Sequence, residues 1–297
     1  MATESKSPIP NSETVKIRPA KLEDAAECGR ISGEAFFKIN TSHGFPPDFP
    51  SADVASGLHR MLFSHPGFYC VVAEVDGRIV GSNCLDERTS IAGVGPITVD
   101  PEIQNRSVGR KLMQAVMDRA AERKFAGVRL VQAAFHNRSL SLYAKLGFDV
   151  REFLSVMQGP PIDKLPDGYR VRPATVSDLD ACNRLCKAVH GHDRSGELTD
   201  AIKEGTATVA ERHGRIAAYA SVLGFFGHAV GETNPDLQAL IATAPKFLGS
   251  GILVPARNAA LFRWCLENGL KVVQPMTLMT AGLYNEPMGA YLPSVLY

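Results

Sequence analysis

The chain has 297 residues, of which 45% are hydrophobic and 21% charged, and its formal net charge at pH 7 is +1. This length and composition suit a globular protein of one large or two smaller domains, and the near-zero charge argues against a nucleic-acid partner. The polar start, the lack of a CxxC pair and the lack of a long apolar run lead us to expect a cytoplasmic protein without a membrane span.

The first half of the chain predicts alternating strands and helices. It opens with a short strand from Lys16 and an amphipathic helix, in which apolar residues from Ala25 to Ala35 recur at three- and four-residue spacing. A hairpin follows at the sequence VDGRI, whose glycine suits a positive φ. Later come, in order, a strand (94–99), a helix (108–124), a strand (128–135), a short helix (137–146) and a strand from Phe148.

The chain also repeats parts of itself. KIRPAKLEDAAECGRI from Lys16 matches RVRPATVSDLDACNRL from Arg170, and VAEVDGRIVG from Val72 matches VAERHGRIAA from Val209. Two ungapped matches in the same order predict a duplicated domain. The Pro- and Gly-rich stretch between the copies is typical of a linker. We predict a disordered tail (1–14), a first domain (15–158), a linker (159–168) and a second domain (169–297).

The second copy diverges after its hairpin. The sequence GILVPARNAALFRWCLENGL, from Gly251, predicts a strand and a helix without a polar, glycine-containing corner between them. We interpret this as loss of that corner from the second copy. The chemistry is therefore expected in the first half alone.

The corner in question lies in the sequence ITVDPEIQNRSVGRKLMQAV, from Ile97. The first turn of a helix has backbone N–H groups without intrahelical partners and a partial positive charge, which together attract a phosphate. Gly109 removes a Cβ that would obstruct the approach, Ser107 adds a hydroxyl, and Arg106, Arg110 and Lys111 add positive charge. An ordinary strand–helix connection with a solvated basic face is the alternative that this stretch alone leaves open.

Two further features favour a ligand slot beside the corner. Pro96 stands within the preceding strand and cannot donate to a β-ladder, so we expect a bulge that splays this strand from its neighbour. Free strand N–H and C=O groups could then pair with the amides of a ligand. Asn137 and Tyr143, at the end of the next strand and on the helix after it, are expected to flank the same slot.

These stretches resemble the GCN5-related N-acetyltransferase (GNAT) superfamily. Its pyrophosphate loop, Gln/Arg-x-x-Gly-x-Gly/Ala, corresponds to residues 104–109, with Ser107 in place of the first glycine, and its later pattern corresponds to Asn137, Tyr143, Lys145, Gly147 and Phe148. Residues 16–157 carry the resemblance, and the rest is similar to tandem members with a degenerate second copy. The resemblance implies an α/β fold of two such domains, each with a mixed sheet. It also implies acetyl-CoA binding by Ile97, Thr98, Val99, Gln104, Asn105, Arg106, Ser107, Val108, Gly109, Arg110, Asn137 and Lys145.

The same resemblance implies a chemistry of direct acetyl transfer to an amine. The amine must be neutral to attack, the tetrahedral oxyanion needs N–H donors near Val99, and the departing thiolate needs a proton. Tyr143 resembles the general acid of the family, and packing in the core is its alternative role. No carboxylate occurs from Ala92 to Val99 to act as base. Asp86 or Glu87 acting through water is one alternative, and the α-carboxylate of Tyr297 is another, by analogy with a related tandem arrangement.

Acceptor contacts are expected from the proline-rich loop 40–50, which carries His43, Phe45, Asp48 and Phe49, and from residues 225–232 of the second copy. A lid over the site and a structural Ω-loop are the two roles left open for the first of these segments. We expect no metal, because His190 and His192 form one pair without a spaced partner, and Cys182 and Cys186 are more typical of buried thiols. The predicted function is N-acetyl transfer from acetyl-CoA to a small-molecule or peptide amine. A non-catalytic acyl-CoA sensor and a protein-lysine acetyltransferase remain as alternatives, and the sequence does not predict the oligomeric state.

Overall fold

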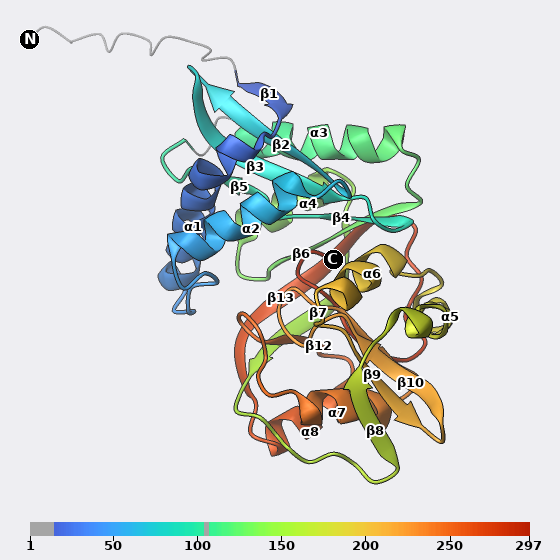
Figure 1. The fold of residues 1–297 in the computed structure, drawn as a ribbon. Coiled ribbons are helices and arrows are strands. Elements are labelled where there is room, and N and C mark those ends of the chain that lie inside the picture. The colour runs from blue at the N-terminus through green and yellow to red at the C-terminus, as the bar shows by residue number, and fades with distance from the viewer. Residues whose placement is uncertain (1–14, 104–106) are drawn as a thin grey trace, which may run out of the picture.

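The computed structural model describes residues 15–103 and 107–297 (Figure 1). The predicted tail and the loop residues Gln104, Asn105 and Arg106 therefore lie outside the described residues. Within the described ranges, the strands form one sheet of nine and one of five, both flanked by helices. The larger sheet contains both parallel and antiparallel pairs, so the predicted mixed α/β fold is confirmed.

The first half follows the predicted order of elements. Its predicted strand 94–99 is instead two strands, because Pro96 has no N–H with which to continue a ladder. The chain passes from one to the other through Gly95 and Pro96. The elements are β1 (Lys16–Pro19), α1 (Ala25–Ser42), α2 (Ala52–Ser64), β2 (Phe68–Val75), β3 (Arg78–Asp86), β4 (Ile91–Val94), β5 (Thr98–Val99), α3 (Val108–Glu122), β6 (Gly127–Ala133), α4 (Asn137–Lys145) and β7 (Asp149–Gln158).

The second half repeats this succession, from a strand and two helices through a hairpin to alternating strands and helices. Its elements are β8 (Tyr169–Pro173), α5 (Leu179–His190), α6 (Ser195–Lys203), β9 (Thr208–Arg212), β10 (Arg215–Ala220), β11 (Ala229–Gly231), α7 (Asn234–Thr243), β12 (Ile252–Pro255), α8 (Ala259–Glu267), β13 (Lys271–Gly282) and β14 (Ala290–Leu292).

Residues that match between the two sequence copies make matching contacts. Arg18 on β1 forms ion pairs of 2.7 Å with Asp24, which precedes α1, and with Glu74 on β2. The second copy repeats both contacts, again at 2.7 Å, in Arg172, Asp178 and Glu211. The identities seen in the sequence thus preserve an ion-pair triad that ties the first strand to the first helix and the hairpin.

The two halves exchange strands in the larger sheet. Its order at one end is β6-β13-β7-β12, so β13 of the second half lies between β6 and β7 of the first. In return, β7 lies between β13 and β12. Figure 1 shows β13 in orange-red running beside the green strands of the first half. The division at residues 158 and 169 stays a prediction about the sequence, because the sheet itself is continuous across it.

Helices cover both faces of the larger sheet near the first half. The buried side chains of α3 pack with Val71 and Ala73 of β2 on one face, while Leu62 of α2 packs with Cys70 on the other. Cys70 and Cys84 form a disulfide across β2 and β3, which the sequence did not predict. Among the described helices, none is long and apolar enough to cross a membrane.

Candidate active site

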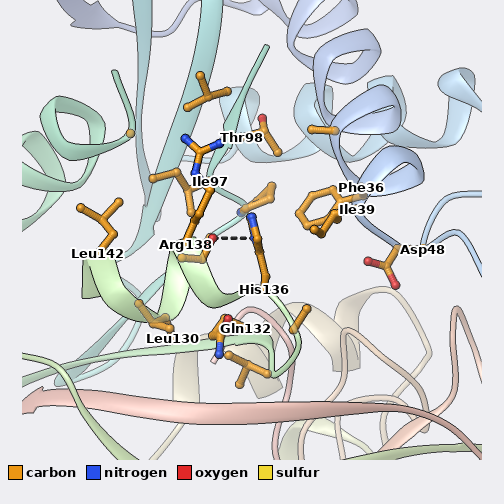
Figure 2. A pocket seen from close by; sticks show the side chains of 18 of the residues that line it. Phe36, Ile39, Asp48, Ile97, Thr98, Leu130, Gln132, His136, Arg138 and Leu142 are labelled. Carbon is orange, nitrogen blue, oxygen red and sulfur yellow. Dashed lines mark hydrogen bonds between the residues drawn. The ribbon is translucent and has the colours of Figure 1, made fainter. Parts of the chain in front are cut away.

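The larger sheet splits open after Pro96. β4 pairs with β3 on one side and with β6 on the other, but β5 pairs with β3 alone. The β4–β6 ladder ends at Arg129, and the rest of β6 lines a pocket of about 850 Å³ together with residues 94–99. The predicted splay therefore leaves one edge of β5 facing a cavity, as Figure 2 shows around Ile97 and Thr98.

The start of α3 opens into this pocket. Ser107 precedes the helix with a φ of 61° and its side chain makes no capping hydrogen bond, and the first turn contains no acidic residue. A Cβ added at Gly109 would lie 3.6 Å from Leu142 and 3.7 Å from Val99, inside the slot. Ser107, Val108, Gly109 and Arg110 all line the pocket. Among the described residues, no side chain caps this first turn, so its N–H groups face the pocket in a form that suits an anion.

One predicted charge points elsewhere. The ammonium of Lys111 donates to the backbone oxygen of Val15 at 3.2 Å, so it belongs to the packing of the N-terminal strand rather than to the corner. Arg110, in contrast, is an exposed residue that lines the pocket.

The corresponding corner of the second half is closed by the chain itself. The helix after β11 is α7, and the carboxylate of Asp236 accepts hydrogen bonds from the backbone N–H of Thr233, at 2.9 Å, and from its hydroxyl. Asp236 therefore supplies the negative charge that a ligand would bring. In addition, β14 pairs with the edge of β11 opposite β10. In the first half, β5 takes the place of β11 beside the hairpin, and its corresponding edge has no strand partner.

The structure corrects the interpretation of the segment that begins at Gly251. It forms β12 and α8, which repeat β6 and α4 rather than the corner, since both helices have nine residues and follow a strand by the same short turn. The seventh residue is Tyr143 in α4 and Cys265 in α8. The backbone oxygen of Tyr143 accepts a 3.0 Å hydrogen bond from the N–H of Phe148, and that of Cys265 accepts one of the same length from the N–H of Leu270. The second copy thus has a cysteine at the position of the tyrosine.

Tyr143 both packs in the core and lines the pocket. Its side chain is 5% exposed and contacts the hydrophobic cluster under α3. Burial raises the pKa of Tyr143 to about 12, although a hydrogen bond with Ser139 partly opposes the shift. Ser139 in turn lies 2.7 Å from Nδ1 of His136, which also lines the pocket. Asn137 and Lys145 of the same helix complete this wall.

The opposite end of the pocket is aromatic and comes from both halves. His43 lines it as predicted, whereas Phe45 is absent from the lining and instead stacks on Phe135 at 4.4 Å between ring centroids. Two pairs of aromatic rings line this end. The ring centroids are 5.8 Å apart in the pair Phe36–Phe49 and 5.6 Å apart in the pair Phe225–Phe226. The predicted stretch 225–232 therefore reaches the cavity through its first two residues.

Two polar residues also lie at this end. Asp48 belongs to the loop that is predicted to contact the acceptor, whereas Gln132 was not predicted as a site residue. Asp48 is a pocket-lining carboxylate whose Oδ1 accepts hydrogen bonds from Gln274 at 2.9 Å and from Ser250 at 3.4 Å. Burial raises the pKa of Asp48, against the effect of these donors. Gln132 on β6 is 6% exposed and donates to Thr277 at 2.6 Å, while its carbonyl oxygen has no partner in the described structure.

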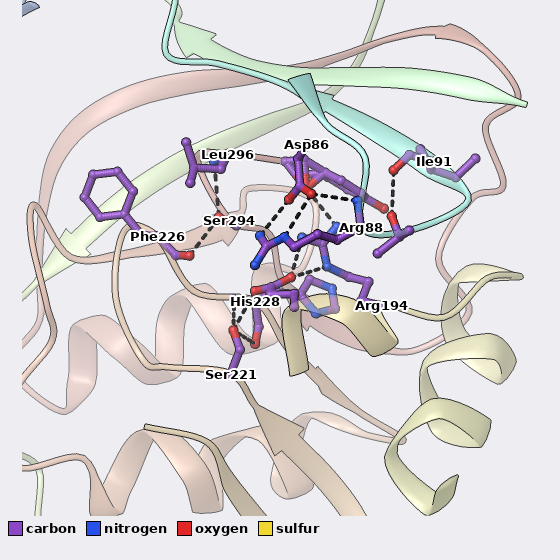
Figure 3. Close-up of polar contacts among 12 residues, drawn as sticks. Asp86, Arg88, Ile91, Arg194, Ser221, Phe226, His228, Ser294 and Leu296 are labelled. Carbon is purple, nitrogen blue, oxygen red and sulfur yellow. Dashed lines mark hydrogen bonds and ion pairs between the residues drawn. The ribbon is translucent and has the colours of Figure 1, made fainter. Parts of the chain in front are cut away.

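The candidate bases named from the sequence lie away from the pocket. Asp86 pairs with Arg88 at 2.7 Å, and Glu87 pairs with Arg119 at 2.6 Å. The backbone oxygen of Tyr297 accepts a hydrogen bond from the buried Arg194 at 2.9 Å. Neither acid nor Tyr297 is among the described residues that line the cavity. Figure 3 shows Asp86 and Arg88 within a polar cluster between the two halves.

That polar cluster also positions the wall contributed by the second half. Ser294 donates to the backbone oxygen of Phe226 at 2.9 Å and accepts from the N–H of Leu296 at 3.1 Å (Figure 3). His190 and His228 meet at 3.1 Å between their Nε2 atoms. Among the described residues, no group of three or more His, Cys, Asp or Glu side chains could hold a metal ion.

Comparisons with known proteins agree on one family. The model of the acetyltransferase (GNAT) family matches residues 35–148. A curated mycothiol acetyltransferase from Tsukamurella paurometabola is 26% identical over 152 residues, which cover 48% of this chain and 50% of that protein. The chain thus spans about half the length of the curated relative it matches.

Solved structures support the fold over the whole chain. A protein from Pyrococcus horikoshii, described provisionally as an acetyltransferase, superimposes with a TM-score of 0.72 at 17% identity, covering 97% of this chain and 98% of the other. A tandem GNAT protein from the clavulanic acid biosynthesis pathway superimposes with a TM-score of 0.56 at 15% identity, covering 91% of this chain and 98% of that one. At these identities the likeness concerns the fold, including its tandem arrangement.

Proposed function

We propose that this chain, of which residues 35–148 match the model of the acetyltransferase (GNAT) family, transfers the acetyl group of acetyl-CoA to a primary amine. The acceptor class is a small molecule or a peptide. One observation carries the proposal: a single cavity connects the uncapped start of α3, the unpaired edge of β5 and the hydroxyl-bearing Tyr143.

The pocket offers complementary surfaces to two parts of acetyl-CoA, the diphosphate and the pantetheine arm. Its diphosphate suits the first-turn N–H groups of α3, because Gly109 leaves the approach open and Arg110 adds positive charge. The amide groups of its pantetheine arm suit the edge of β5, which has backbone N–H and C=O groups without a strand partner on that side. Asn137 and Lys145 flank the same path.

In the proposed reaction, a neutral amine attacks the thioester carbon, the C–N bond forms and the C–S bond breaks. A lysine-like amine is only about 0.04% neutral at pH 7, which corresponds to a penalty of roughly 4–5 kcal/mol. Backbone N–H groups near Val99 stabilise the oxyanion. Tyr143 donates its hydroxyl proton to the departing thiolate, so that in the net balance one amine proton ends on sulfur. Its raised pKa keeps Tyr143 in the protonated form that this role requires.

The test is acceptor-dependent release of CoA thiol, measured with a panel of alkyl amines, aryl-alkyl amines and lysine peptides. Thiol release with at least one acceptor supports the proposal. Tight acetyl-CoA binding in calorimetry without thiol release from any acceptor would favour the sensor, and activity confined to peptides would favour the lysine acetyltransferase.

A further inference from the structure

We propose that His136 is the general base of the reaction, and that Ser139 passes a proton from His136 to the acid Tyr143. The base takes the proton that the amine nitrogen loses after its attack on the thioester. This inference rests on the proposed function, since it assigns a further role in the same cavity. Neither Asp86 nor Glu87 is among the described residues that line this cavity, whereas His136, Ser139 and Tyr143 all line it.

The three side chains form one connected proton path along the start of α4. The hydroxyl oxygen of Ser139 lies 2.7 Å from Nδ1 of His136, the residue that precedes the helix. Tyr143 follows Ser139 by four residues, the spacing at which helical side chains are neighbours, and a hydrogen bond joins the two. Two hydrogen bonds in sequence place the imidazole within roughly 6 Å of the tyrosine hydroxyl. In Figure 2, His136 lies in the middle of the cavity, and a dashed line marks its bond.

The direction of the proton path follows from what each group can donate. Ser139 has a single hydroxyl proton, and a bond that lowers the pKa of Tyr143 is one that Ser139 donates to the phenol oxygen. The oxygen of Ser139 then accepts from His136, so the neutral ring carries its proton on Nδ1. Its other nitrogen, Nε2, has a lone pair that can accept a proton. The hydroxyl proton of Tyr143 stays available for sulfur.

His136 has the neutral form that a base requires at pH 7. Burial lowers the pKa of His136 below 6.5, and positive charge at Arg138 on α4 and at His43 after α1 acts in the same direction. The other charged side chains among the described residues that line the cavity are Lys38, Asp48, Arg110 and Lys145. A neutral imidazole in the cavity is therefore ready to accept a proton when the amine reacts.

The proton path balances the proposed reaction. The amine attacks in its neutral form, and as the C–N bond forms, its nitrogen becomes positively charged. Nε2 of His136 then takes a proton from that nitrogen, directly or through one water. The C=O bond re-forms and the C–S bond breaks with its electron pair on sulfur, which takes the hydroxyl proton of Tyr143. Tyr143 takes the proton of Ser139, and Ser139 takes that of Nδ1. The ring is neutral again as the other tautomer, and exchange with water restores the first after the products leave.

The alternative role for the pair of His136 and Ser139 is structural, as a brace at the start of α4. His136→Gln separates the two roles, because the amide can still hydrogen-bond to Ser139 but takes up no proton at neutral pH. Ser139→Ala removes the hydroxyl and Ser139→Thr keeps it. The matched control is Ser141→Ala, which removes a hydroxyl from an exposed position of the same helix, outside the lining of the cavity.

The experiment measures thiol release with benzylamine and with a lysine peptide over a range of pH. At each pH, kcat/KM of the wild type is divided by that of a variant, so that the ionisation of the acceptor cancels. For His136→Gln this ratio should be roughly 10² above pH 7. It should fall towards one as the pH falls through the pKa of His136, which lies below 6.5, because the imidazolium cannot accept a proton.

The remaining variants test the path beyond His136. Ser139→Ala should lower kcat/KM about 10-fold with the same pH dependence, Ser139→Thr should restore most of the loss, and Ser141→Ala should change nothing. The double variant of His136→Gln and Ser139→Ala should lose no more than His136→Gln alone, because Ser139 then has no proton to pass on. The Kd for acetyl-CoA, measured by calorimetry, should stay the same in every variant.

A second measurement needs no turnover. Nitrogen-15 NMR of histidine-labelled full-length protein, with the His136 signals identified by their loss in His136→Gln, should show a proton on Nδ1 and none on Nε2 at pH 7. Ser139→Ala should weaken this preference, because it removes the acceptor of the Nδ1 proton.

Full activity of His136→Gln, a ratio that is the same at every pH, or a proton on Nε2 of His136 at pH 7 would each overturn the inference. Full activity of Ser139→Ala would overturn the path between base and acid. If thiol release occurs without dependence on His136, the inference fails and the proposed function stands. If no acceptor gives thiol release, the proposed function fails and the inference fails with it, so the two failures are distinguishable.

Discussion

Replacing Gly109 by alanine should strengthen the fold and weaken acetyl-CoA binding. Gly109 lies in the first turn of α3, has no left-handed φ, and lines the pocket. An added Cβ would stand at ordinary contact distance from Leu142 and Val99, 3.6 and 3.7 Å away, so the protein itself accommodates it. The methyl group would, however, occupy the approach to the first-turn N–H groups.

The two effects have opposite signs and separate magnitudes. Alanine in place of a helical glycine stabilises a protein by about 0.5–1 kcal/mol, because the unfolded chain loses conformational freedom. Loss of one N–H bond to a charged phosphate oxygen costs about 1.5–3 kcal/mol of binding free energy. This corresponds to a Kd for acetyl-CoA that is roughly 10- to 100-fold higher.

The assay pairs calorimetric titration of acetyl-CoA with urea unfolding of the free protein. Gly57→Ala is the matched control, since Gly57 lies in the middle of α2, is exposed, and has no atom within 4 Å of an added Cβ. It should raise stability by a similar amount and leave the Kd unchanged. If Gly109→Ala binds acetyl-CoA as tightly as Gly57→Ala does, the corner does not hold the diphosphate and the reasoning is refuted.

Three further predictions concern the acid and the paired copies. Tyr143→Phe should lower kcat by roughly 10²–10⁴-fold with little change in acetyl-CoA affinity. In the wild type, kcat should show no Tyr143-dependent fall below pH 10, because burial raises the pKa of Tyr143 to about 12. A fall near pH 8 that Tyr143→Phe abolishes would contradict this. The ion pairs with arginine lower the pKa of Asp24 and Asp178 from about 3.8. Their stabilisation is therefore present above that value and is lost as the pH falls through the lower pKa values of the folded state. The free energy of unfolding, followed by circular dichroism, should fall by about 1–3 kcal/mol in Asp24→Asn and in Asp178→Asn at pH 7 and by much less at pH 2, and equal losses at both pH values would exclude this cause. Asp236→Asn should cost about 1–3 kcal/mol in urea unfolding without changing the Kd for acetyl-CoA, whereas weaker acetyl-CoA binding would mean that the second corner also takes part.

Local patterns predicted the parts of the site that lie close together in the sequence. The missing N–H of Pro96 indicated a bulge within one strand, where the structure has a break between β4 and β5. The helical stripe that starts at Val108 correctly predicted the start of α3. Tyr143 and Asn137 follow β6 at a spacing that any strand–turn–helix unit would place near the same slot. These inferences needed only backbone chemistry and the period of a helix.

The sequence indicated which loops lie at the other end of the pocket, but not the contacts that their side chains make there. The hydrogen bond from Gln274 to Asp48 spans 226 residues, and no local pattern predicts such a partner. The arginine partners of Asp86 and Glu87 could not be predicted for a related reason, since their sequence position near the slot says nothing about the arginines that bind them. Side-chain pairing across a sheet depends on strand order, which the sequence periods leave open.

The exchanged strands make the second half part of the framework of the pocket. β13 supplies the ladder partner of β6 along its whole length, so the wall that carries Gln132 and Leu130 is held in place by the second half. The bond from Gln132 to Thr277 comes from that same pairing. Meanwhile β14 and Asp236 fill, in the second copy, the positions that stay open in the first. The described residues therefore form one open slot, and its far wall, its aromatic lining and the orientation of the Asp48 carboxylate all depend on the half in which the equivalent slot is closed.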